Sequence, residues 1–197
     1  MTSSPSLLPI RAGHDPDVTP RIIVPEALLG RLDLEAECRL GTYSTGTCPD
    51  VIAELAAARL LGRGGAGFPA HIKWRAVAAG QGAKVIVANG EEGEPSSFKD
   101  RWLLTRRPHL VLEGLLGAAE AIGANRAIVY LSHPDTVTAV RAAVAELEGS
   151  TIARSVSNIE IHVVRPTYVA GEETAVCRSI NGGPALPAAK PPRPFEQ

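Results

Sequence analysis

The sequence is poor in several features that would assign it to a familiar class of protein. Aromatic residues make up 4% of its 197 residues, and cysteine occurs three times. No apolar run approaches the roughly 20 residues that cross a membrane. The net charge of −1 lacks the basic excess of a nucleic-acid-binding protein. We therefore expect no direct insertion into a membrane and no nucleic acid among the partners.

The cysteines and histidines also lack the spacing that is typical of disulfide frameworks, metal sites and catalytic sets. Cys38, Cys48 and Cys177 form no CxxC pair, so neither a disulfide framework nor an iron–sulfur cluster held by this chain alone is expected. The histidines show no metal-ligand spacing, and no Ser/His/Asp or Cys/His set stands out. We predict no metal ligands and no catalytic side chains. The N-terminal stretch "MTSSPSLLPIRAGHDPD" has no signal-peptide pattern, which predicts a cytoplasmic protein.

What is present indicates a globular α/β protein, since 45% of the residues are hydrophobic. Short apolar runs predict buried strands at 84–90, 126–132 and 159–165. Helical patterns occur at 48–62, 99–107, 109–123, 134–149 and 171–180, with a short helix expected within 25–40. The helix at 48–62 is expected to begin near Pro49 and to end at Gly62 as its C-cap. Strand–helix–strand alternation predicts a parallel sheet covered by helices, with ligands at the carboxyl ends of the strands.

A glycine-rich loop lies in the stretch "LGRGGAGFPAHIKW", residues 61–74. Backbone without Cβ atoms can approach a phosphate or a flat ring closely. The spacing of Gly62, Gly64 and Gly67 matches G-x-G-x-x-G. However, the loop follows a helix and precedes the first strand, which is the reverse of the dinucleotide fingerprint. No G-K-[ST] follows, so a P-loop is excluded. A tight turn without a ligand remains the alternative.

Two acidic segments follow predicted strands. Asn89 lies at the end of the strand predicted at 84–90, and Glu91, Glu92 and Glu94 follow it directly. Carboxylates there can accept hydrogen bonds from ribose or ribityl hydroxyls but cannot hold a phosphate. The alternative is a solvated turn. The segment "YVAGEET" places two further carboxylates at a helix start, where ordinary capping is the alternative.

The chain resembles one family in four stretches, which occur in the family's order: "GRGGAGFPAHIKW", "NGEEGEPSSFKDR", "PHLVLEGLLGAAEAIGA" and "YVAGEETAV". The family is the NADH- and FMN-binding flavoprotein subunit of respiratory complex I. It also occurs as the diaphorase subunit of NAD-linked hydrogenases and formate dehydrogenases. The resemblance covers roughly residues 45–195. It implies a Rossmann-like domain in which NADH passes a hydride to FMN, which hands single electrons to an iron–sulfur cluster.

The resemblance also implies a site and a domain division. The cofactor-binding positions that it assigns are Gly62, Arg63, Gly64, Gly65, Ala66, Gly67, Phe68, Lys73, Asn89, Glu91, Glu92, Glu94, Tyr168, Gly171, Glu172 and Glu173. The expected division is an N-terminal extended and helical arm at 1–44, the FMN-binding domain at 45–183, and a proline-rich tail or linker at 184–197.

The chain departs from the family at positions that bear on its electron donor. Family aromatics that stack on NADH are replaced by Ala76 and Arg193. The family's later segments, which hold the FMN phosphate and an iron–sulfur cluster, are not in this sequence. We therefore expect a separate iron–sulfur protein or cluster-bearing chain as partner. The alternatives are an FMN module with another donor such as a ferredoxin, a non-catalytic subunit of a split redox complex, or a repurposed nucleotide- or flavin-binding enzyme.

Overall fold

A parallel three-stranded sheet forms the centre of the part of the chain that the structure describes. The computed structural model describes residues 22–44, 50–62, 66–152 and 158–189. The strands lie in the order β1-β2-β3, with bounds Val85–Asn89, Arg126–Leu131 and Ile159–Val163. Val87 is paired with Ile128 in the first ladder, and Val129 with Ile161 in the second. The predicted α/β class with a parallel sheet is confirmed.

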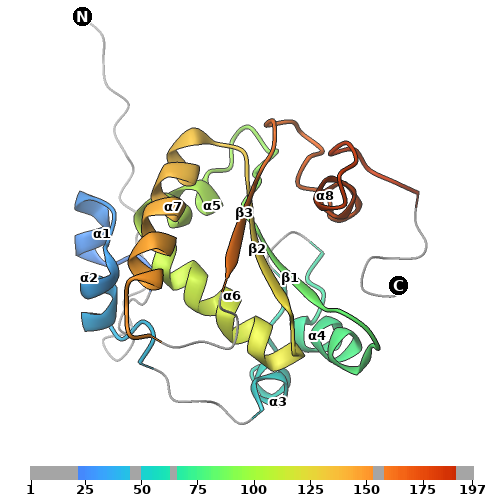
Figure 1. The fold of residues 1–197 in the computed structure, drawn as a ribbon, viewed down its shortest axis with the longest axis horizontal. Coiled ribbons are helices and arrows are strands. Elements are labelled where there is room, and N and C mark those ends of the chain that lie inside the picture. Colours follow the sequence, from blue (N-terminus) through green and yellow to red (C-terminus); the bar gives the residue numbers. More distant parts are fainter. Residues whose placement is uncertain (1–21, 45–49, 63–65, 153–157, 190–197) are drawn as a thin grey trace, which may run out of the picture.

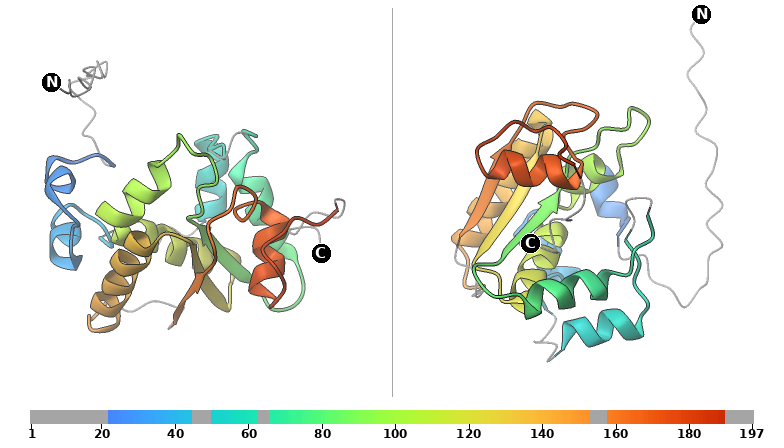
Figure 2. Two further views of the ribbon diagram at one scale, coloured as in Figure 1. Left: turned by 90° about the horizontal axis from the view of Figure 1, so that it is seen from above. Right: turned by 90° about the vertical axis from the view of Figure 1, so that its right-hand side faces the viewer.

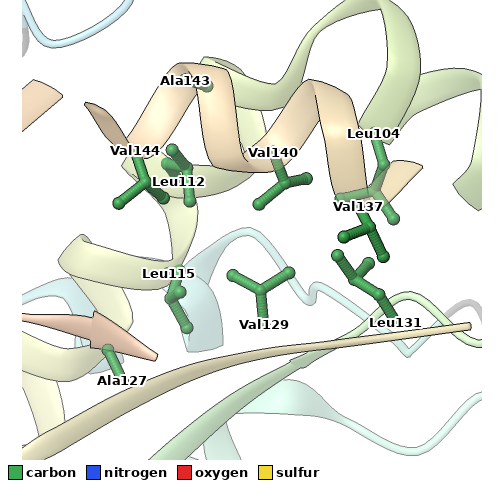
Figure 3. Packing of buried hydrophobic residues seen from close by; sticks show 10 residues of the cluster. All are labelled: Leu104, Leu112, Leu115, Ala127, Val129, Leu131, Val137, Val140, Ala143 and Val144. Carbon is green, nitrogen blue, oxygen red and sulfur yellow. The ribbon is translucent and has the colours of Figure 1, made fainter. Parts of the chain in front are cut away.

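Helices cover both faces of this sheet (Figure 1). The connections between strands carry α5 (Lys99–Arg106), α6 (Pro108–Ile122) and α7 (Pro134–Glu148). Helix α6 packs on β1 and β2, α7 packs on β3, and α8 (Glu173–Ile180) lies on the opposite face. The core between the sheet and α5–α7 consists of aliphatic side chains such as Leu112, Val129 and Val140 (Figure 3). No helix among the described residues is long and apolar enough to cross a membrane.

The helix that precedes the glycine-rich loop is shorter than predicted. Helix α3 covers Val51–Ala57, and its N-cap is Asp50, whose carboxylate accepts a hydrogen bond from the Ala53 N–H. It ends because Arg59 adopts a left-handed conformation (φ 49°) and Leu60 N–H bonds to the Leu55 carbonyl. The prediction that Gly62 is the C-cap is therefore wrong. Gly62 instead closes the loop by donating its N–H to the Phe68 carbonyl at 2.8 Å. Pro49 lies outside the described residues.

One helix, α4 (Ala70–Ala79), is not among those that the sequence predicts. Its sequence, "AHIKWRAVAA", has no clear apolar stripe. It also comes directly after glycine and proline residues, which are typical of turns, so the sequence pattern does not indicate a helix. Helices α3 and α4 lie side by side (Figure 2, right). In the sequence, these two helices flank the glycine-rich loop.

The N-terminal segment forms two short helices where one was expected, α1 (Pro25–Leu29) and α2 (Leu34–Arg39). A fully buried ion pair joins Glu37 of α2 to Arg107, and the Arg107 Nη1 also donates to the Ile22 carbonyl at 3.1 Å. These contacts fasten residues 22–44 to the helices on the α5–α7 side of the sheet.

A second polar cluster, around Glu146 of α7, holds the same segment. Burial acts to raise the pKa of Glu146, but hydrogen bonds from Arg31, His109 and the Leu34 N–H outweigh it and lower that pKa from 4.5 to about 2. The charged form of this carboxylate is therefore strongly preferred in the folded protein.

Candidate functional site

Two adjoining cavities lie where the strands end. The first, here called the acidic cavity, has a volume of about 470 Å³ and is lined by Asn89, Glu91, Glu92, Glu94, Tyr168 and Gly171, among others. The second, here called the glycine-loop cavity, has a volume of about 810 Å³. Its lining includes Gly62, Ala66, Gly67, Phe68, Lys73, Asn89, Gly171, Glu172 and Glu173. The structure thus brings together all the predicted site residues that it describes. Arg63, Gly64 and Gly65 lie outside the described residues.

Asn89 and Gly171 line both cavities and join the two segments that form them. The Asn89 Nδ2 donates to the Gly171 carbonyl at 2.8 Å, and its Oδ1 accepts from the Glu91 N–H at 3.2 Å. Asn89 is the last residue of β1, so the sheet itself sets the position of this amide. The end of β1 and the segment after β3 are therefore held against each other at the base of the site.

Two glycines allow these segments to approach so closely. A Cβ on Gly93 would lie 2.3 Å from the Tyr168 carbonyl oxygen, and one on Gly171 would lie 2.9 Å from the Glu91 carbonyl oxygen. Side chains do not reach such distances without a shift of backbone. At the mouth of the acidic cavity, the Tyr168 hydroxyl donates to Glu94 Oε1 at 3.0 Å, and this bond to a carboxylate raises the pKa of Tyr168. Both walls of the acidic cavity are thus fixed by short contacts.

Glu91 carries a polar atom that the described residues leave without a partner. The residue is 7% exposed, and its Oε2 is buried and accepts no hydrogen bond within the described part of the chain. A buried acceptor without a donor costs about 1–3 kcal/mol. Because Glu91 lines the acidic cavity, a ligand with a hydroxyl or N–H donor would satisfy it.

Two other predicted carboxylates serve as helix caps. Glu92 accepts from the Ser97 hydroxyl at 2.6 Å and from the Arg101 N–H at 3.0 Å, near the start of α5. Burial acts to raise the pKa of Glu92, but these bonds and that from Lys99 lower it below 4.5 overall. Glu172 caps α8 by accepting from the Thr174 and Ala175 N–H groups, which agrees with the capping alternative. Both carboxylates therefore accept hydrogen bonds from the protein itself, at the starts of the helices that border the site.

Lys73 brings a positive charge to the glycine-loop cavity. Its Nζ lies 3.8 Å from Glu173 Oε2, and 5.5 Å from the centre of the Phe68 ring. Lys73 belongs to α4 and Glu173 to α8, so this pair spans the two helices that flank the cavity. Ala76, three residues further along α4, lines a separate cavity of about 390 Å³ that also contains Cys177.

Residues of the sheet also hold the site segments in place, and the sequence alone does not indicate this role. Tyr130 is fully buried in β2, and its hydroxyl donates to the Ala170 carbonyl at 3.1 Å. The His162 ring stacks on it at 5.4 Å, and His162 Nε2 lies 2.9 Å from Ser179 Oγ. A tyrosine in an apolar run carries no sign of such a role. Ser97 also lines the acidic cavity, and only its place within the stretch "NGEEGEPSSFKDR" could have pointed to it.

Fold and site together define a class of protein. An α/β domain whose glycine-rich loop and carboxylates gather at the carboxyl edge of a parallel sheet has the arrangement of nucleotide-binding domains. No group of histidine, cysteine or acidic side chains in the described ranges could hold a metal ion.

The comparison with known proteins narrows this class to one family. The model of the Nuo51 FMN-binding domain matches residues 55–197, and the chain belongs to this family. The resemblance seen in the sequence is thereby confirmed.

Similar proteins include components of two kinds of redox enzyme. A subunit of the NADH-quinone oxidoreductase of Rhizobium meliloti is 43% identical over 79% of this chain and 38% of its own length. The alpha subunit of the NAD-reducing hydrogenase HoxS of Cupriavidus necator is 37% identical, over 75% of this chain and 26% of its own. A crystal structure of a NAD+-reducing [NiFe]-hydrogenase in the H2-reduced state matches with a TM-score of 0.68 and 33% identity, over 90% of this chain and 31% of that one. The chain thus spans about a third of the length of these relatives.

Proposed function

We propose that this chain is an FMN-binding electron-transfer module, which accepts a hydride from NADH and passes electrons to an iron–sulfur partner. One observation above all supports the proposal. The buried Glu91 carboxylate has an oxygen, Oε2, without a hydrogen-bond partner among the described residues, and Glu91 lines a cavity at the carboxyl edge of the sheet. Membership of the Nuo51 FMN-binding family identifies the ligand chemistry that would satisfy this oxygen.

The residues present fit a flavin nucleotide. Glu91 and Asn89 offer acceptors to ribityl hydroxyls or to a ring N–H, as expected from their place at and just after the end of β1. Gly67 and Phe68 give the glycine-loop cavity a wall that a flat ring can approach, and Lys73 supplies a cation beside it. FMN, when bound, supplies the redox chemistry, whereas these side chains bind it, orient it and exclude water.

The partner and the cellular location belong to the same proposal. Two of the similar proteins are named as subunits, which supports a multi-subunit assembly for this chain. We propose an iron–sulfur protein or cluster-bearing chain as the electron acceptor and the cytoplasm as the location. The proposed FMN-binding domain covers residues 45–183, between the N-terminal arm and the proline-rich tail.

The absorbance spectrum of the protein tests the proposal directly. Protein purified from its own host, or reconstituted with excess FMN, is expected to show a flavin band that NADH bleaches under anaerobic conditions. A flavin band that ignores NADH would refute NADH as the donor and favour a donor such as a ferredoxin. Failure to bind FMN, alone and together with a cluster-bearing partner, would refute the module itself and favour a non-catalytic subunit.

A further inference from the structure

Residues 184–189, which follow α8, turn back along that helix. Gly182 has φ +84°, a conformation that suits glycine, and the Gly183 N–H bonds to the Arg178 carbonyl at 2.8 Å. These two glycines reverse the chain directly after α8. The residues that follow lie first beside Arg178 and then beside Thr174, which is one turn nearer the start of the helix.

Specific hydrogen bonds hold this returning segment, residues 184–189, here called the strap. The Arg178 Nη1 donates to the carbonyl of Leu186 at 3.1 Å and to that of Pro187 at 3.2 Å. The Ala188 N–H donates to Thr174 Oγ1 at 2.8 Å. Prolines at 184 and 187 stiffen the strap, because each fixes its own φ. One exposed arginine and one buried threonine thus fix a segment that composition alone assigns to a linker.

The strap reaches the candidate site through Thr174. The N–H of this residue donates to Glu172 Oε2 at 2.9 Å, and Glu172 lines the glycine-loop cavity. The Thr174 hydroxyl accepts a hydrogen bond from the Ala188 N–H and donates one to the Glu172 carboxylate. A continuous set of hydrogen bonds therefore connects Arg178, the strap, Thr174 and a cavity-lining carboxylate.

We propose that Arg178 is a positioning residue for the ligand-binding site, because it fastens the strap to α8 and thereby fixes the start of α8 at the glycine-loop cavity. Arg178 touches no ligand itself. It acts on affinity for the ligands of this cavity and not on the redox step. The inference rests on the proposed FMN and NADH site.

The test compares Arg178→Gln with the parent chain and with a control, Arg39→Gln. Arg39 is an exposed arginine on α2 whose pairing partner is Glu35, so the control makes the same charge change away from the site. Hydrogen exchange of the Ala188 amide measures the strap, and flavin fluorescence measures the Kd for FMN. Steady-state NADH oxidation with ferricyanide then separates KM from kcat.

In Arg178→Gln, exchange at Ala188 is expected to accelerate about tenfold. The Kd for FMN or the KM for NADH should rise about fivefold, and kcat should stay within about twofold, as expected when a positioning hydrogen bond is lost. Arg178→Lys, which keeps a positively charged donor group, should recover part of the affinity. Arg39→Gln should match the parent.

Two results would overturn the inference while leaving the proposed function intact. In a chain that binds FMN, the Ala188 amide could exchange as fast in the parent as in Arg178→Gln. That result would show that Arg178 does not fasten the strap to α8. Alternatively, the variant could free the strap yet bind both ligands as the parent does, which would make the strap a linker. Failure of the parent to bind FMN would instead refute the proposed function, and with it the effect on binding.

Discussion

Replacing Gly93 by alanine tests the close contact on which the acidic cavity depends. The added Cβ would lie 2.3 Å from the Tyr168 carbonyl oxygen and 2.9 Å from its carbonyl carbon. Both neighbours are backbone atoms, so no rotamer change can relieve the contact. Either the loop after β1 or the segment around Tyr168 must move, and such overpacking costs about 1–3 kcal/mol. For a chain of this size each kcal/mol lowers Tm by about 2–4 °C, so the expected loss is about 2–12 °C.

Gly114→Ala is the matched control. This glycine lies inside α6 with no atom within 4 Å of an added Cβ. Alanine there should raise stability by about 1 kcal/mol, because glycine is a poor helix former. Thermal unfolding followed by circular dichroism measures both variants, and FMN titration shows whether Gly93→Ala also weakens binding. A Gly93→Ala protein with the Tm and FMN affinity of the parent would refute the packing described for this wall.

Three further predictions concern charged side chains that are buried or partly buried. Glu91→Gln should keep or raise the stability of the ligand-free protein but raise the Kd for FMN about tenfold, because the buried oxygen without a donor is the acceptor offered to a ligand; equal affinities would contradict this. The folded-state pKa of Glu146, about 2, lies below the ordinary 4.5, so its contribution to stability is present above about pH 4.5 and is lost as the pH falls toward 2. Glu146→Gln should thus lose on the order of 2 kcal/mol in urea unfolding at pH 7 but little at pH 2, whereas the exposed Glu148→Gln should change neither. Arg107→Met should cost about 3–5 kcal/mol by leaving Glu37 buried and unpaired, and the Glu37→Met/Arg107→Met double variant should recover most of that loss.

The strands and the long helices could be predicted because their signals are local. Val85–Asn89 and Arg126–Leu131 are short apolar runs, and α6 and α7 begin with proline and carry regular apolar faces. Gly123 ends α6 with φ 67°, as a glycine after a helix should. These features need no knowledge of distant contacts.

The errors arose where distant contacts or atypical residues decide the local structure. Arg59 takes the left-handed conformation that glycine usually adopts, so α3 ends before the first glycine, where the sequence predicts its end. Helix α4 has no strong stripe of its own and depends on packing against α3 and α6.

The candidate site shows the same division. The acidic and glycine-rich segments are evident from composition, but the separate roles of their residues are not. Glu91 and Glu92 are adjacent in the sequence, yet Glu91 has a buried oxygen without a partner among the described residues, whereas Glu92 accepts from a backbone N–H in the first turn of α5. The Tyr130 hydroxyl donates a hydrogen bond to the Ala170 carbonyl, and the two residues are 40 positions apart in the sequence. Only the three-dimensional arrangement separates such residues.

Glu92 and Glu172 each have two roles, and this limits how the domain can change over evolution. Each carboxylate lines a cavity and also accepts hydrogen bonds from backbone N–H groups in the first turn of a helix. A substitution that alters ligand preference at either position would at the same time weaken α5 or α8. Selection for a new ligand is therefore expected to act first on Glu91, Glu94 and Lys73. A deep mutational scan should find Glu92 and Glu172 intolerant even when survival depends on folding alone.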